Sequence, residues 1–205
     1  MNTAHDHAVD LETALDFVNT LKFHGGDPVE VLGTTDEALG WLHGHGLVHH
    51  QALARPNEGP ALERIRRTRG ALRELVDATY EARPPDSKAI AEVNRALRAR
   101  EVVQLVPGPD GLRLDHRHVG DPLDDALANL AEPIVREIVS GRPERLRACA
   151  SETCRWVFYD DSRTGRRRWC DMASCGNRAK AARHRARTRA AGETADQATA
   201  RWTDR

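Results

Sequence analysis

The strongest constraint on this 205-residue chain is the placement of its four cysteines, which all lie between positions 149 and 175. They form two pairs, Cys149 with Cys154 and Cys170 with Cys175. Four residues separate the members of each pair and fifteen residues separate the pairs. Two short-spaced pairs joined by a loop suit a tetrahedral zinc site, because each pair puts two thiolates on one compact turn.

Spacing alone leaves disulfides or plain buried thiols as alternatives. A segment of about 45 residues buries little apolar surface, and a structural metal supplies the folding free energy that such a segment lacks. We therefore expect one structural zinc ion, held by all four cysteines. The first residues lack the basic and apolar regions of a signal peptide, and no apolar run approaches the roughly 20 residues of a spanning helix. A cytoplasmic protein without a membrane partner is expected.

The charge of the chain is divided unevenly along its length. The whole sequence has 31 basic and 31 acidic residues, and this zero net charge would argue against a nucleic-acid partner. Residues 1–142, however, have 16 basic and 23 acidic residues, whereas residues 143–205 have 15 and 8, so the net charges are −7 and +7. We predict an N-terminal domain over 1–142, a zinc finger over 143–191 and a flexible tail over 192–205.

Helical periodicity dominates the N-terminal part. It predicts helices over residues 11–21, 35–45, 61–81, 87–97 and 122–140. The β-branched run at 102–106, the turn residues at 107–111 and the alternating leucines Leu112 and Leu114 predict a β-hairpin. The expected fold class is α+β, a mostly helical domain with one small antiparallel β-hairpin, followed by the finger.

One polar cluster in the first helix is a candidate ligand site. Asp16, Asn19 and Thr20 lie at helical spacing on one face, where they would offer a carboxylate, an amide and a hydroxyl to a small molecule. The alternative is capping and local hydrogen bonding at the end of the helix. The sequence has no phosphate loop, dinucleotide-binding turn or nucleophile elbow, so we do not expect an enzyme. An enzyme would have to use Asp16 or a histidine as general base.

Between and after the cysteine pairs, the sequence predicts a hairpin and then a helix. Residues 156–159 are expected to form one strand, residues 160–165 a turn and residues 166–169 the second strand. A helix then begins near Cys175, with Ser174 as its N-cap, and its dipole would stabilise the Cys175 thiolate. This is the order of elements in a treble-clef finger.

The predicted last helix is strongly basic. Between Arg145 and Arg189 there are 13 basic and four acidic residues, and no acidic residue occurs from Arg178 to Gly192. A solvated surface is the simplest explanation of a charge run, but here no acidic neighbour relieves the repulsion, so an external polyanion is favoured. Either Asn177 or Arg178 is expected to be structural, because both lie beside the metal turn. The candidate nucleic-acid contacts are Arg166, Arg167, Arg168, Arg178, Lys180, Arg183, Arg185, Arg187 and Arg189.

Two segments resemble known families. Residues 149–189, with Cys175-Gly176-Asn177-Arg178 at their centre and Arg-Arg-Trp-Cys at 167–170, closely resemble the CGNR zinc finger. The Leu-Asp-Phe-Val-Asn-Thr motif at 15–20, with Trp41-Leu42 and Gly46-Leu47, resembles the ABATE domain that precedes such fingers. The resemblance implies a bacterial transcription regulator whose finger binds DNA and whose N-terminal domain receives a signal.

Several functional hypotheses remain open at this point. In the leading one, the finger binds DNA and the N-terminal domain binds a small-molecule effector or mediates homodimerisation. In a second, the finger binds structured RNA or the ribosome. In a third, the finger docks on a protein, including the acidic half of this same chain, which would then restrain the finger electrostatically.

Overall fold

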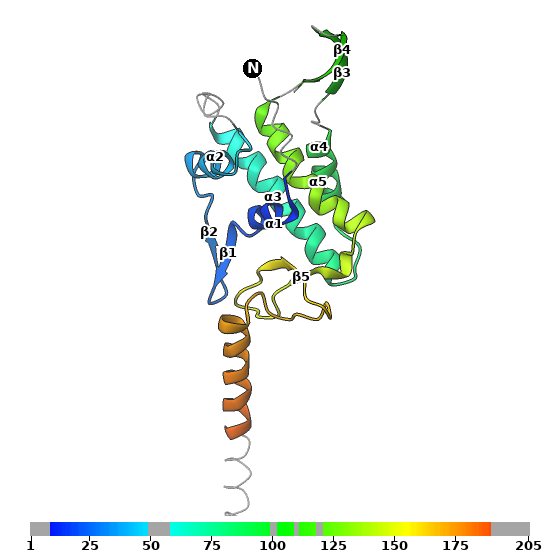
Figure 1. The fold of residues 1–205 in the computed structure, drawn as a ribbon. Coiled ribbons are helices and arrows are strands. Elements are labelled where there is room, and N and C mark those ends of the chain that lie inside the picture. The colour runs from blue at the N-terminus through cyan, green and yellow to red at the C-terminus, as the bar shows by residue number, and fades with distance from the viewer. Residues whose placement is uncertain (1–8, 49–57, 99–101, 109–110, 118–120, 190–205) are drawn as a thin grey trace, which may run out of the picture.

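The computed structural model describes residues 9–48, 58–98, 102–108, 111–117 and 121–189. Helices form the main body, the cysteine segment packs against one end of it, and a final helix extends away from both (Figure 1). The fold class is α+β, as predicted. In chain order the elements are α1 Leu11–Val18, β1 Leu21–His24, β2 Asp27–Glu30, α2 Thr35–Gly44, α3 Glu58–Tyr80, α4 Ser87–Leu97, β3 Val102–Gly108, β4 Gly111–Arg117, α5 Pro122–Ser140, β5 Leu146–Ala148 and β6 Val157–Tyr159.

Each of the five predicted N-terminal helices is present, and side-chain caps fix where four of them begin. Asp10, Asp86 and Asp121 accept hydrogen bonds from backbone N–H groups in the first turns of α1, α4 and α5. Thr34 and Glu37 form a reciprocal capping box at the start of α2. The first helix is shorter than predicted, because it ends at Val18 and Asn19 caps it.

The strands form three separate antiparallel pairs. The β3–β4 hairpin is the one that the sequence predicts. The β1–β2 hairpin is not among the predicted elements. Gly25 and Gly26 have φ angles of +64° and +102°, the left-handed conformations that a two-residue hairpin turn requires.

One hydrophobic core joins the helical body to the strands of the cysteine segment. It contains Phe17 of α1, Leu72 of α3 and Ile134 of α5, and it also contains Leu146 of β5 and Val157 of β6. The short strands that lead into and out of the first cysteine pair are therefore part of the main core. The cysteine segment is built onto the helical body rather than tethered beside it. No helix among the described residues has the length and hydropathy needed to cross a bilayer.

Candidate metal centre and nucleic-acid interface

The first cysteine pair lies on a turn that β5 and β6 close. The Cys149 N–H donates to the Trp156 carbonyl at 2.8 Å, and the Cys154 N–H donates to the Ser151 carbonyl at 2.9 Å. The chain reverses at Arg155, whose φ of +53° lies in the left-handed region. These bonds bring Cys149 and Cys154 onto one compact loop, as the four-residue spacing predicts.

The second pair is positioned by Asp171. Its carboxylate accepts hydrogen bonds from the N–H groups of Ala173 at 3.2 Å and Ser174 at 2.8 Å. This cap begins the π-helical turn Met172–Gly176, which contains Cys175 and leads directly into the helix over 177–189. The N-cap of this helical segment is thus Asp171 and not Ser174, because the carboxylate has two oxygens that satisfy two orphan donors.

The four sulfur atoms meet at one point in the fold. All lie within 4.8 Å of one another, with Cys154 and Cys170 separated by 3.7 Å and Cys170 and Cys175 by 3.8 Å. Zinc–sulfur bonds of about 2.3 Å in a tetrahedron place the sulfurs about 3.8 Å apart, whereas a disulfide needs about 2.05 Å. All four cysteines are free, so the disulfide alternative is wrong for this structure. The donor set fits one structural zinc ion.

The pKa shifts of the cysteines show that the thiolates cannot all form easily here without a cation. Burial raises the pKa of Cys154, and burial together with the charge of Cys149 raises the pKa of Cys170. Burial acts in the same direction on Cys175, but hydrogen bonds from Arg178 and from the other cysteines outweigh it and lower the pKa of Cys175. Four clustered thiolates repel one another, and a bound divalent ion removes that repulsion.

Asn177 and Arg178 both support the metal turn. The Asn177 amide donates to the Ala173 carbonyl at 3.1 Å, and the Arg178 guanidinium donates to the Cys175 sulfur at 3.0 Å. The sequence predicted that one of the two is structural, whereas the structure gives both residues this role. Arg178 was also expected to contact nucleic acid. Its guanidinium lies on a metal ligand, where it stabilises the thiolate. Arg178 is nevertheless exposed, so its contact with nucleic acid stays a prediction.

Of the three arginines before Cys170, one bonds within the finger and two are exposed. The Arg167 guanidinium donates to the Cys170 carbonyl at 2.6 Å and lies 4.9 Å from the centre of the Phe158 ring. The Arg167 N–H donates to the wholly buried carboxylate of Asp160. The structure therefore gives Arg167 a supporting role in the finger, and its contact with nucleic acid stays a prediction. Arg166 and Arg168 are exposed.

The predicted strand over residues 166–169 does not form. Strand β6 pairs instead with β5, and Leu146 lies opposite Tyr159. The physical reason is burial. Leu146 is almost completely buried in the main core, whereas a strand of three consecutive arginines would have to stay solvated on both faces.

The helix over residues 177–189 stands clear of the rest of the protein. In Figure 1 it is the orange helix that leaves the finger and points away from the helical body. Apart from the half-buried Ala179, every residue in it is exposed. None of its basic side chains from Lys180 to Arg189 forms an ion pair with another described residue. The candidate contacts that it presents to solvent are Lys180, Arg183, Arg185, Arg187 and Arg189.

The three residues predicted to bind a small ligand do not share one exposed surface, because Asn19 and Thr20 are buried whereas Asp16 is exposed. Asn19 is buried, and its side chain makes two hydrogen bonds to the backbone of Val157. The Thr20 hydroxyl donates to the Phe17 carbonyl at 2.7 Å and accepts from the buried Arg69 at 3.1 Å. Asp16 is exposed. Asn19 and Thr20 are therefore engaged in hydrogen bonds inside the fold. Only the bond from Thr20 to Phe17 is local, as the alternative interpretation expected, because Val157 and Arg69 are distant in sequence.

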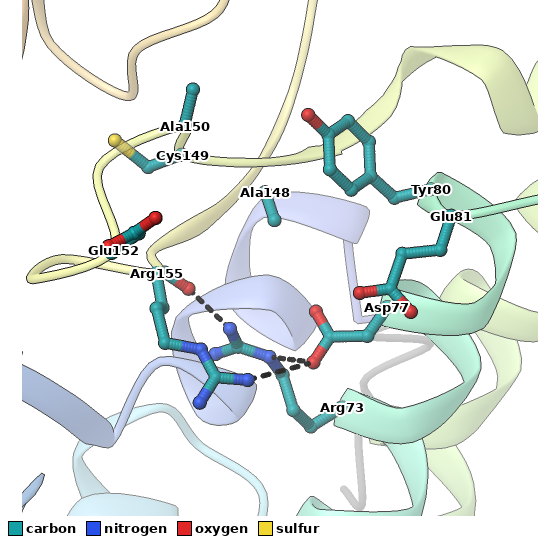
Figure 2. Close-up of a pocket in the computed structure, with 9 residues that line it drawn as sticks. All are labelled: Arg73, Asp77, Tyr80, Glu81, Ala148, Cys149, Ala150, Glu152 and Arg155. Atoms are coloured by element: carbon teal, nitrogen blue, oxygen red, sulfur yellow. Dashed lines mark hydrogen bonds and ion pairs between the residues drawn. The ribbon is translucent and has the colours of Figure 1, made fainter.

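A pocket of about 450 Å³ lies between the end of α3 and the first cysteine turn, and Cys149 is one of the residues that line it. Figure 2 shows how its charged side chains join the two parts. Arg73 donates to Asp77 at 2.9 Å and also to the Arg155 carbonyl, while the Arg155 guanidinium lies 3.9 Å from the same carboxylate. The i, i+4 spacing of Arg73 and Asp77 is a visible sequence signal, but nothing in the sequence connects them to Arg155.

Comparison with protein-family models gives two matches that together cover most of the chain. The model described as "CGNR zinc finger" matches residues 145–188. The ABATE model, described as "Putative stress-induced transcription regulator", matches residues 11–142, which is more than half of the chain. No curated protein matches the chain. The chain therefore belongs to the ABATE family and carries a CGNR zinc finger after its ABATE domain.

Proposed function

We propose that this protein is a DNA-binding transcription regulator in which zinc fixes the base of a basic helix that contacts duplex phosphates. The observation that carries the proposal is the helix over 177–189, which is exposed on almost all sides and has no acidic partner among the described residues. Like charges at i, i+4 destabilise an isolated helix, and a polyanion removes that cost. The family matches to a transcription regulator and a zinc finger support the same function.

The contact surface follows from exposure and from existing bonds. Arg167 and Arg178 hold the finger itself, so they are left out of the surface. The remaining basic side chains are exposed and available to phosphate oxygens, which they would bind without sequence preference. They are Arg166, Arg168, Lys180, Arg183, Arg185, Arg187 and Arg189.

The N-terminal domain is the part that would receive a signal, as an effector-binding or dimerising unit. Its helices share a core with β5 and β6, so a change in its packing reaches the finger directly. The pocket beside Cys149 is a place where a small effector would touch both parts at once. Sedimentation at increasing protein concentration tests dimerisation, because a dimerising domain gives a concentration-dependent mass and a monomeric one does not.

DNA binding is tested by titrating the zinc-loaded full chain with a short labelled duplex between about 50 and 200 mM salt. Four to six neutralised phosphates predict a slope of about −4 to −5 for log affinity against log salt. The matched control is Lys22→Gln with Lys88→Gln, two exposed lysines on β1 and α4, which should leave the slope unchanged. Undetectable binding at low salt, or salt-independent binding, would refute the proposal. Preference for structured RNA in a competition would assign the finger to RNA instead.

A further inference from the structure

The basic residues of the helix over 177–189 fall into two rows on opposite sides. Successive residues of an α-helix are rotated by about 100°, since one turn contains about 3.6 residues. Arg185 and Arg189 therefore share one side, and Lys180, Arg183 and Arg187 share the side roughly opposite. Both rows are exposed along their whole length.

Two faces of the helix separate the basic rows, and one of these faces is made of small side chains. Ala179, Ala182 and Ala186 lie between them at helical spacing, so nothing larger than a methyl group projects there. We do not count Arg178 in either row of proposed phosphate contacts, because its guanidinium is bound to Cys175. That bond ties the first turn of the helix to the metal centre and leaves the later turns free to contact a partner.

We infer that this helix lies in the major groove of B-form DNA, with one basic row on the phosphates of each strand and the alanine face toward the base edges. The inference rests on the proposed function and specifies its geometry. The groove is about 12 Å wide, and a helix with its side chains is about 10–12 Å across. Two rows on opposite sides then reach the two walls of the groove together.

Binding of the helix to a single phosphate backbone would leave the charge of one basic row without a partner. If the helix lay across a single phosphate backbone, one row would be neutralised and the other would remain in water, still without an acidic partner in the described structure. Groove binding neutralises both rows. It also selects the form of the duplex, because the major groove of A-form RNA is too deep and narrow to admit a helix.

The test compares two variants that lose the same charge from different rows. One is Arg185→Gln with Arg189→Gln, and the other is Lys180→Gln with Arg187→Gln. Groove binding predicts that each variant makes the salt slope shallower by about two, and that the two lose DNA affinity to within about threefold of each other. Lys22→Gln with Lys88→Gln is the charge-matched control and should match the unmodified protein. Equal zinc content and equal helicity show that every variant is folded.

Each outcome decides between specific alternatives. If one row carries nearly all of the loss, the helix binds one strand and the groove geometry is wrong. If the unmodified protein binds A-form RNA duplex as tightly as B-form DNA, the geometry is also wrong. If the unmodified protein binds no duplex DNA at all, the proposed function itself fails. As an independent readout, methylation of guanine N7, an atom of the major groove, should weaken binding, and unchanged binding would contradict the groove geometry.

Discussion

The side chain of Asn19 acts as a strand partner for Val157. Its amide donates to the Val157 carbonyl at 2.8 Å, and its carbonyl oxygen accepts from the Val157 N–H at 2.9 Å. Both residues are buried, so neither backbone group has water as a substitute. This pair fixes the end of α1 to the strand that follows the first cysteine turn.

Replacing Asn19 should therefore destabilise the whole chain. Asn19→Ala leaves two buried backbone groups of Val157 without partners, which should lower the free energy of unfolding by about 2–4 kcal/mol. Urea unfolding followed by circular dichroism measures the change. Asp16→Ala, on the exposed side of the same helix, is the control and should stay within about 0.5 kcal/mol. Equal effects of the two substitutions would contradict the role given to Asn19.

Zinc should be present at one equivalent and should depend on all four cysteines. Cys170→Ser removes one of four thiolates and should reduce the metal content to a small fraction, measured by elemental analysis of the purified protein. Ser174→Ala lies in the same turn but does not cap it, so its zinc content should stay at one equivalent. Full zinc in Cys170→Ser would disprove the four-cysteine site.

Removal of zinc should lower the stability of the helical body as well as that of the finger. Because Leu146 and Val157 belong to the main core, a chelator should lower the unfolding temperature of the α-helical signal as a whole. Calorimetry on the zinc-loaded and chelated proteins measures this shift. A helical transition that keeps its temperature after zinc is removed would show that the two parts unfold independently.

Glu30 and Arg69 should give a pH-dependent contribution to stability. Arg69 is almost fully buried and binds both Glu30 oxygens, at 2.6 and 2.5 Å. Burial alone would raise the pKa of Glu30, but the bonds from Arg69 and Leu32 outweigh it, so the pKa lies below its ordinary value of 4.5. The stabilising form is the carboxylate. Its contribution is complete above pH 4.5 and is lost as the pH falls through the lower pKa of the folded state.

Glu30→Gln should accordingly cost on the order of 2 kcal/mol at neutral pH, because the Arg69 charge is left without its partner. The difference from the unmodified protein should shrink as the pH falls below 4.5. Urea unfolding at several pH values measures the difference, and effects of acid on the zinc site are common to both proteins. Glu63→Gln, an exposed partner of Arg67, should change stability by less than about 0.5 kcal/mol at every pH. A Glu30→Gln difference that does not vary with pH would contradict the assignment.

Charge repulsion within the last helix should limit its helicity. Arg183 with Arg187, and Arg185 with Arg189, are like-charged pairs at i, i+4, each unfavourable by about 0.2–0.5 kcal/mol. Arg185→Glu turns one pair into an attraction, so it should raise helicity measured by circular dichroism and at the same time weaken DNA binding. Arg163→Glu, with the same charge change in an exposed turn, should leave helicity unchanged. Loss of helicity in Arg185→Glu would contradict the repulsion argument.

The parts of this fold that the sequence predicts are those governed by neighbours along the chain. Apolar spacing identifies the five helices, and cysteine spacing identifies the metal centre. The helices depend on residues within one or two turns of each other, and the metal centre depends on four cysteines within 27 residues of one another. Spacing also places Asn177 and Arg178 beside the metal turn, which predicts a structural role for one of them.

The errors around Asn19 and Arg167 involve partners that are distant in sequence or that belong to the backbone. A carbonyl or N–H group has no side-chain signature, so nothing in the pattern around Asn19 indicates Val157. The same holds for Arg167, whose guanidinium bonds a carbonyl. The opposite charges of the two halves suggested electrostatic attachment. The described contacts between them are instead mainly apolar packing and hydrogen bonds, with Arg155 and Asp77 as an ion pair across the boundary.

The contact between Asn19 and Val157 joins positions 138 residues apart, and this separation governs how the protein is made. During translation, α1 leaves the ribosome long before β6 exists. The nascent helices must therefore wait with an incomplete core until the cysteine segment has been synthesised. A ribosome that stalls before Val157 would release a chain with exposed apolar surface and no metal site, a natural substrate for chaperones and proteases.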